Sequence, residues 1–346
     1  MAEPVERVLT QRELNRALLE RQFLLARKRE TLPRTLERIG GIQAQHAPSM
    51  YIGLWSRLEG FEREHLTRAL ERKTVVQGTL LRSTIHLVSA RDYWPFAIGV
   101  RRARREWWLR VHSEGRDEIA AAAARLRRRL AHGPLPRAEL MESLNTDLFN
   151  GAGLWLDMVR APPSGTWERR RADIYAAADG WLGPAVGIAP DEGIDLLVTR
   201  YLGGFGPARP AEIADWAGVP GRTISSALER RTLRRFRDEQ GRLRVDLPRA
   251  PLPDPETPAP VRFLPTWDAT LLTHARGAEI LPEEYRPLVF NTKNPRSVGT
   301  FTVDGAVAGS WRHEGGRIRL SPFRRLSREA RREAEEEAER LAELHA

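Results

Sequence analysis

Apolar residues recur at the spacing of an amphipathic helix through residues 9–72 and then give way to a β-rich stretch. Thr10, with Glu13 three residues later, has the pattern of a capping box, which marks the start of a helix. Residues 75–88 (VVQGTLLRSTIHLV) predict two strands around a turn that contains glycine. Helices followed by a two-stranded hairpin are the order of a winged helix, a variant of the helix-turn-helix. The predicted helices are residues 9–29, 31–39, 51–58 and 64–72.

The same order of elements recurs further along the chain. Long helices are predicted over 90–111 and 117–131. The octet GPLPRAEL at 133–140 is similar to GPARPAEI at 206–213. Self-similarity at intervals of about seventy to a hundred residues indicates tandem copies of one structural unit. In the third copy the predicted elements are helices at 194–202, 211–217 and 222–231 and a hairpin at 234–247.

The last quarter of the chain has a different pattern. Residues 248–260 (PRAPLPDPETPAP) predict a stiff proline-rich linker. Short β-rich runs follow, with Asp304-Gly305 as a hairpin turn, and they predict a small antiparallel barrel or sandwich. A charged helix with alanine and leucine on one stripe is predicted over 327–346. The predicted strands are 261–264, 269–272, 287–290, 297–304, 306–313 and 316–320.

These patterns predict an α+β protein of tandem winged-helix units followed by a small C-terminal β domain. A length of 346 residues fits more than one domain. The predicted organisation is winged-helix units at 1–90, 91–190 and 191–248, a linker at 249–260, a β-barrel at 261–325 and a terminal helix at 326–346.

The charge balance indicates a polyanionic partner. The chain has 56 Lys+Arg against 46 Asp+Glu, a net charge of +10 and a pI near 10.7. Lysine occurs only at positions 28, 73 and 293, so nearly all of this charge is arginine, which binds phosphates and guanine edges bidentately. For the APPSGTWERRR loop at 161–171, a solvated basic turn is the alternative to phosphate contact. For the other arginines of the set, a solvated basic face is the alternative. The arginines that we expect to contact phosphates of such a partner are Arg101, Arg102, Arg104, Arg105, Arg169, Arg170, Arg171, Arg222, Arg230, Arg231, Arg234 and Arg235.

Composition also excludes several classes of chemistry. The chain has no cysteine, which excludes disulfides, Cys-ligated zinc and a thiol nucleophile. No apolar run approaches the length of a membrane span, and the N-terminus lacks the apolar core of a signal peptide. The histidines show no metal-ligand spacing, so neither a metal nor a cofactor is expected. We expect a cytoplasmic, nucleoid-associated monomer with no membrane partner.

Two glutamines form the most distinctive polar pair. Gly40 and Gly41 allow a tight end to the preceding helix. Gln43 and Gln45 then place two amides one residue apart, where an extended or half-turn backbone would aim both the same way, with the short side chain of Ala44 packed behind them. From these residues alone, a polar helix end followed by a loop is the alternative interpretation.

Several segments together resemble the AlkZ/YcaQ-type winged-helix DNA glycosylases, in order and along nearly the whole chain. The resemblance implies tandem winged helices in a C shape with a C-terminal β-barrel. It also implies double-stranded DNA as partner and alkylated purines as substrates, including bulky N7-guanine adducts and crosslinked guanines. The family's Gln-aliphatic-Gln signature falls on Gln43 and Gln45, which are therefore the expected catalytic pair. The segments are GGIQAQ (40–45), YIGLWSRL (51–58), GTLLRSTIHLV (78–88), GPA (206–208), IADW (213–216), LPTWD (264–268), ILPE (280–283), VDG (303–305) and WR (311–312).

Two amides suit one particular hydrolysis. Glutamine cannot serve as a general base, but an N7-alkylated guanine already carries positive charge and is a good leaving group. We expect the pair to hold a water and to stabilise a sugar that is becoming an oxocarbenium ion. Thr84 and His86 alternate along one strand close to Arg82 and are the candidate pocket residues. A buried structural histidine is the alternative role for His86.

The predicted function is therefore that of a monofunctional DNA glycosylase, because no lysine near the glutamines is available to form a Schiff base. The alternative is a non-catalytic winged-helix DNA-binding protein or transcriptional regulator. Both would bind duplex DNA with a steep salt dependence, but only the enzyme would leave abasic sites. A metal-dependent nuclease would need clustered carboxylates, whereas the acidic residues here are interleaved with arginine.

Overall fold

The N-terminal part of the chain is helical, as its apolar spacing predicts. The computed structural model describes residues 4–142, 144–171, 173–291 and 296–346. The predicted capping box is confirmed: the Thr10 hydroxyl accepts from the Glu13 N–H, and the Glu13 carboxylate accepts from the Thr10 N–H. Elements up to residue 89 are β1 (Val8–Leu9), α1 (Gln11–Arg21), α2 (Leu32–Ile39), β2 (Ile42–Gln43), α3 (Ala47–Trp55), α4 (Arg63–Glu71), β3 (Val75–Thr79) and β4 (Ile85–Ser89).

The first hairpin is present, but the prediction of its turn was wrong. Gly78 lies inside β3, where a Cβ atom would come within 2.6 Å of the Tyr93 ring. The chain instead reverses through residues 80–84, in which Arg82 and Ser83 have φ values of 50° and 57°. Glycine at this position therefore allows close packing of a helix on the sheet and does not mark the turn.

A six-stranded sheet extends from this hairpin into the next part of the chain. Its strand order is β2-β4-β3-β6-β7-β5. Gln77 of β3 pairs with Arg160 of β6, so strands from both sides of residue 90 share one sheet. The elements that follow β4 are α5 (Ala90–Val111), α6 (Arg116–Leu130), β5 (Leu135–Pro136), α7 (Arg137–Leu140), α8 (Thr146–Leu156), β6 (Met158–Arg160), β7 (Ile174–Ala177) and α9 (Ala178–Leu182).

The helix-helix-helix-hairpin order predicted after residue 190 is confirmed. Helix α10 packs closely on α5, because a Cβ atom at Gly193 would lie 2.5 Å from the Pro95 carbonyl oxygen. Gly218 ends α11 in the left-handed conformation, at φ 71°. Strand β1 adds in parallel to β8, giving the sheet order β1-β8-β9. These elements are α10 (Pro190–Phe205), α11 (Pro210–Ala217), α12 (Gly221–Glu229), β8 (Arg234–Asp238) and β9 (Leu243–Asp246).

The C-terminal part forms an open sheet and not the predicted barrel. The order β10-β13-β14-β15 leaves β10 and β15 as edges of a four-stranded sheet in the described residues. Two of the predicted strands are wrong, because residues 269–271 form a 3₁₀ turn and residues 286–289 form α13. The elements are β10 (Arg262–Leu264), α13 (Arg286–Val289), β11 (Phe290–Asn291), β12 (Arg296–Ser297), β13 (Gly299–Val303), β14 (Ala306–Glu314), β15 (Arg317–Pro322) and α14 (Arg328–His345).

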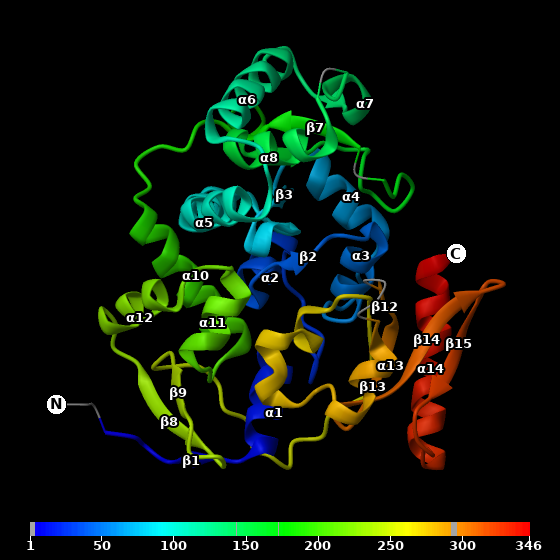
Figure 1. Ribbon diagram of the computed structural model, residues 1–346. Coiled ribbons are helices and arrows are strands. Elements are labelled where there is room, and N and C mark those ends of the chain that lie inside the picture. Colours follow the sequence, from blue (N-terminus) through cyan, green and yellow to red (C-terminus); the bar gives the residue numbers. More distant parts are fainter. Residues whose placement is uncertain (1–3, 143, 172, 292–295) are drawn as a thin grey trace.

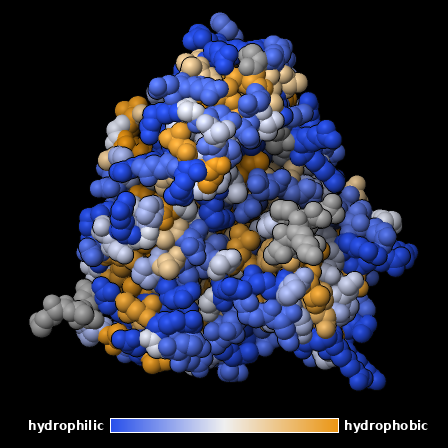
Figure 2. All heavy atoms as spheres, viewed as in Figure 1, coloured by the Kyte–Doolittle hydropathy of each residue, from blue (hydrophilic) through white to orange (hydrophobic). Residues whose placement is uncertain are grey.

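The elements surround a centre formed by α2 and β2 (Figure 1). Helices α6 and α8 lie at the top of that view, β8 and β9 at the lower left, and α14 with β14 and β15 at the right. Hydrophilic side chains cover most of this face, with smaller apolar patches between them (Figure 2). Among the helices that the structure describes, not one combines the length and the apolar character needed to cross a membrane.

Candidate active site

Gln43 ends the short strand β2 at the edge of the six-stranded sheet, and Gln45 lies in a bend two residues further on. Gly40 and Gly41 both have φ near 80°, which ends α2 and turns the chain into β2. Gln43 pairs with His86 of β4, and the Ala44 N–H donates to the Ile85 carbonyl at 2.7 Å, so the pairing continues beyond β2. Of the two predicted alternatives, the backbone is extended at Gln43 and bends at Gln45.

The two amides have different surroundings. Gln43 is buried, with 9% of its surface exposed, whereas Gln45 is exposed. The Gln43 Oε1 atom accepts from Arg82 Nη2 at 3.2 Å, and the Gln45 Oε1 atom accepts from the Ile85 N–H at 3.3 Å. Each carbonyl oxygen is therefore anchored by one hydrogen bond and retains a second acceptor position.

His86 is buried beside Gln43 and is neutral. Its Nδ1 atom donates to the Thr84 carbonyl at 3.1 Å, and the Thr84 hydroxyl lies 3.4 Å from the same nitrogen. Burial, together with the nearby charge of Arg82, lowers the pKa of His86 to about 3. The structure therefore brings together all five residues predicted for the catalytic pair and the pocket: Gln43, Gln45, Arg82, Thr84 and His86.

The arginines predicted on α5 are mostly held by the protein itself. Arg104 is buried, pairs with Asp157 and donates to the Thr79 carbonyl at 2.6 Å. Arg101 pairs with the same aspartate at 2.8 Å. Arg105 donates to two carbonyls near the end of α8, and burial lowers its pKa to about 10. These contacts join α5 to α8 and leave Arg104 with no exposed guanidinium for a phosphate.

Several predicted arginines of the α10–β9 segment are also ion-paired. Arg230 pairs with Asp195 at 2.8 Å, and Arg231 donates to the Asp195 carbonyl at 2.6 Å. Arg234 pairs with Glu6 at 2.9 Å, and Arg235 lies half-buried on β8. Arg222, at the start of α12, is exposed, and its guanidinium forms neither an ion pair nor a hydrogen bond with the described residues.

The loop at 161–171 is anchored by its aromatic residue. Trp167 is buried and meets the Tyr51 ring edge-on at 5.5 Å and the His345 ring at 5.0 Å. Arg170 lies over the Trp167 ring at 5.3 Å, and Arg169 lies 3.5 Å from Asp173. Arg169, Arg170 and Arg171 are all exposed, so phosphate contact and a solvated basic turn both stay predictions for this loop.

Several of the predicted arginines, some exposed and some half-buried, line a cleft between α5, α10 and α12. The cleft has a volume of about 640 Å³. Of the predicted arginines, Arg101, Arg102, Arg105 and Arg222 line it, and Arg116 at the start of α6 adds to them. Arg102 is partly neutralised by Glu106 at 2.7 Å. A surface with this excess of cations is suited to phosphates.

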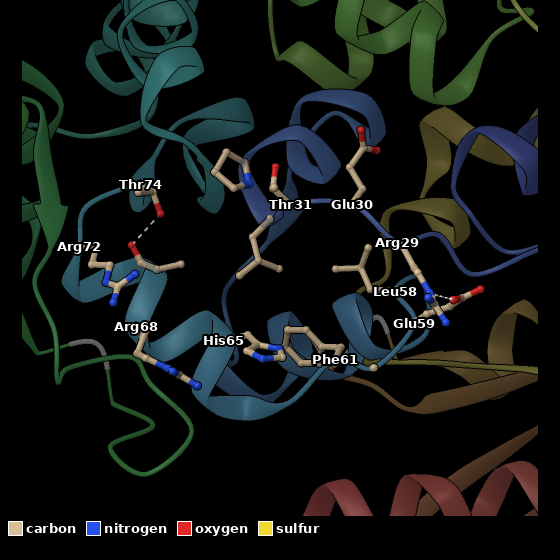
Figure 3. Close-up of a pocket in the computed structure, with 14 residues that line it drawn as sticks. Arg29, Glu30, Thr31, Leu58, Glu59, Phe61, His65, Arg68, Arg72 and Thr74 are labelled. Atoms are coloured by element: carbon tan, nitrogen blue, oxygen red, sulfur yellow. Dashed lines mark hydrogen bonds and ion pairs between the residues drawn. The ribbon is translucent and has the colours of Figure 1, made fainter.

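A second hollow, of about 480 Å³, lies between the start of α2 and α4 (Figure 3). Its rim carries His65, Arg68 and Arg72, and Phe61 lies among them. The described lining contains none of the predicted site residues. This hollow is therefore separate from the site that the glutamines define.

The sequence analysis missed two groups of the candidate site: an arginine that lines the cleft and a backbone carbonyl that holds Arg82. Arg116 follows Gly115 at the start of a helix and was not singled out, although its charge was a usable signal. The Trp216 carbonyl, which accepts from Arg82 Nη1 at 2.6 Å, had no such signal, because 134 positions separate the two residues. Contacts of this kind depend on how α11 docks against the hairpin turn.

Comparisons with known proteins agree with this geometry. The family model described as DNA glycosylase AlkZ-like matches residues 36–344. Among solved structures, Streptomyces sahachiroi DNA glycosylase AlkZ matches with a TM-score of 0.82 and 18% identity, covering 97% of each chain. A search of curated proteins returns no match.

The protein is an enzyme of the DNA glycosylase class, which acts on DNA. It belongs to the AlkZ-like DNA glycosylase family, because the family model covers most of the chain.

Proposed function

We propose that this enzyme is a monofunctional glycosylase that hydrolyses the N-glycosidic bond of cationic alkylated purines in double-stranded DNA. Its substrates would be of the N7-alkylguanine type, with bulky adducts and crosslinked guanines among them. The observation that carries the proposal is the pair of anchored amides beside a neutral histidine, with Gln43 on the edge strand of a sheet and Gln45 exposed just beyond it.

The reaction suits a site without a strong base. Alkylation at N7 makes the purine cationic, so breaking the C1′–N9 bond returns an electron pair to the base and releases it neutral. Water then forms the C1′–O bond and loses a proton to solvent. The free acceptor positions of Gln43 and Gln45 would orient this water, and their carbonyl dipoles would favour the developing positive charge on the sugar.

The neighbouring groups favour hydrolysis over strand cleavage. His86 stays uncharged at neutral pH, so it adds no cation next to the oxocarbenium ion. Lys28 bonds to Glu20, Lys73 lies over the Trp181 ring at 4.0 Å, and Lys293 lies outside the described residues. With neither described lysine directed at the glutamines, a Schiff base with the sugar is not part of the proposal.

The α10–α12 helices with the β8–β9 hairpin would act as a winged helix on the duplex, with phosphates in the arginine cleft. In this proposal the protein works as a monomer on nucleoid DNA. Residues 1–90 and 91–190 would form two further winged-helix units. An open site would accept bulky attachments that a closed base-flipping pocket would reject.

The test is excision of N7-methylguanine from a duplex, with enzyme in excess and alkali to reveal abasic sites. We expect wild-type protein to release the base, and Gln43→Ala and Gln45→Ala each to lower the single-turnover rate by about 10²–10³-fold, the cost of removing one positioned polar group. Glu339→Ala, at an exposed position of α14, is the control and should excise normally. Equal rates in all four proteins would contradict the proposed mechanism.

A further inference from the structure

Arg82 is held in an unusual backbone conformation next to the glutamines. Arg82 and Ser83 both adopt positive φ, which L-residues avoid unless their surroundings enforce it. The turn is closed by the Leu80 N–H, which donates to the Thr84 carbonyl at 2.9 Å, and by the Ser83 N–H, which donates to the Leu80 carbonyl at 3.2 Å. Arg82 is therefore carried on a well-defined turn that projects toward α11.

The contact with α11 is close because of a glycine. A Cβ atom at Gly218 would lie 2.9 Å from the Arg82 backbone nitrogen and 3.0 Å from its Cα. Arg82 Nη1 donates to the Trp216 carbonyl at 2.6 Å, one of the orphan carbonyls at the C-terminal end of α11. One half of the guanidinium is thus fixed to the helix that precedes α12.

The other half of the guanidinium is directed at the predicted catalytic pair. Arg82 Nη2 donates to Gln43 Oε1 at 3.2 Å. In the described part of the chain, no carboxylate forms an ion pair with Arg82. The positive charge of Arg82 is therefore not neutralised by an ion pair, and it strengthens the hydrogen bond to the Gln43 Oε1 atom.

This contact determines how the Gln43 amide lies. An amide group can exchange the positions of its oxygen and its NH₂ by a half-rotation, and a guanidinium can only donate. Arg82 therefore keeps Oε1 on its own side and excludes the flipped orientation, in which NH₂ would face a cation. The hydrogen bond is charge-assisted and stronger than one between neutral groups.

We propose that Arg82 is a positioning residue: it locks the orientation of the Gln43 amide and couples that orientation to the end of α11. This inference rests on the proposed function, because it concerns the same amide pair. Gln45, anchored only by a neutral backbone N–H, has no equivalent lock. The side chain of Arg82 acts through Gln43 and does not itself touch the reacting atoms.

The kinetic test compares Arg82→Ala, Arg82→Lys and the double variant Arg82→Ala/Gln43→Ala in single-turnover excision of N7-methylguanine at saturating enzyme. We expect Arg82→Ala to slow excision by about 10–100-fold, since a small misplacement of a positioned group has effects of this size. In the Gln43→Ala background the same change should have no further effect. Added guanidinium ion should restore part of the Arg82→Ala rate, and Arg68→Ala, on the separate hollow of Figure 3, should be normal.

Three results would overturn this inference. A full additional loss in the Gln43→Ala background would mean that Arg82 acts independently of the amide. Weaker duplex binding with an unchanged excision rate would make Arg82 a phosphate contact. Excision by Arg82→Ala at the wild-type rate would mean that the reaction does not depend on Arg82 holding the Gln43 amide.

A readout that needs no activity separates this inference from the proposed function. The side-chain NH₂ signals of Gln43 can be assigned by their loss in Gln43→Ala. We expect them to be resolved in the wild-type protein and to move to the averaged position of mobile amides in both Arg82→Lys and Arg82→Ala. Unchanged signals would contradict the lock even if the protein excised nothing, and a shift in an inactive protein would leave the lock in place while the proposed reaction failed.

Discussion

At the scale of single residues, the site depends on which polar groups are charged. His86, His274 and His345 are all buried or half-buried, and burial lowers the pKa of each. For His345 the pKa falls to about 4, and its ring stacks on His313 at 4.3 Å. These histidines are neutral in the folded enzyme at neutral pH, and Arg82 is the cation next to the glutamines.

This burial predicts acid sensitivity. Unfolded His86 binds a proton below pH 6.5, whereas the folded form does so only below about 3, so folding stability falls as the pH drops through this window. His86 alone should reduce the free energy of unfolding by about 2 kcal/mol between pH 7 and pH 5. Urea unfolding at the two pH values measures this change. In His86→Gln the difference between them should shrink by that amount, and an unaltered difference would mean that His86 has the same pKa in the folded and the unfolded protein.

At the scale of elements, predictions succeeded where a pattern was long and local. Helix α5 begins and ends at the predicted residues, and the Thr10 capping box starts α1. Failures occurred in short β-rich runs: residues 269–271 satisfy strand composition but form a 3₁₀ turn, because Asp268 caps it by accepting from the Thr270 N–H at 3.1 Å. A local side-chain hydrogen bond decided the conformation there.

The terminal helix gives a prediction at this scale. Leu341 is fully buried within the same apolar cluster as Phe263 and Phe301, although the sequence places α14 after the sheet. Leu341→Ala should destabilise the protein by about 2–5 kcal/mol, the usual cost of truncating a buried leucine. Urea unfolding tests this, with Glu339→Ala on the exposed side of the same helix expected to change stability by less than about 0.5 kcal/mol. Equal effects of the two substitutions would show that α14 does not pack through this stripe.

At the scale of the whole molecule, the net charge of +10 suggests more arginines free to contact DNA than the structure leaves available. Arg104 is buried, and Arg230 and Arg234 are ion-paired, so tertiary contacts give these three predicted DNA contacts a structural role instead. The arginines at the 640 Å³ cleft are the better candidates for phosphates.

The cleft predicts a change in salt dependence. If Arg116 and Arg222 each contact a phosphate, Arg116→Ala/Arg222→Ala should lower the slope of log affinity against log salt concentration by about 2. The change should be similar for unmodified and alkylated duplexes, because phosphate contacts carry no base information. Binding titrations at several salt concentrations provide the measurement, and Arg331→Ala, on exposed α14, is the control. An unchanged slope in the double variant would place the phosphates elsewhere.

The sequence by itself determined long helices such as α5, the α10–β9 order, the polar character of the Gln-Ala-Gln segment and the family, because periodicity, capping residues and turn glycines act over a few neighbouring positions. Tertiary structure decided the rest. It joined β3 to β6 across residue 90, left the C-terminal sheet open, and set Arg82 between Trp216 and Gln43. Whether an arginine meets solvent, a carboxylate or an amide depends on segments far away in the chain. A local sequence pattern therefore cannot predict that contact.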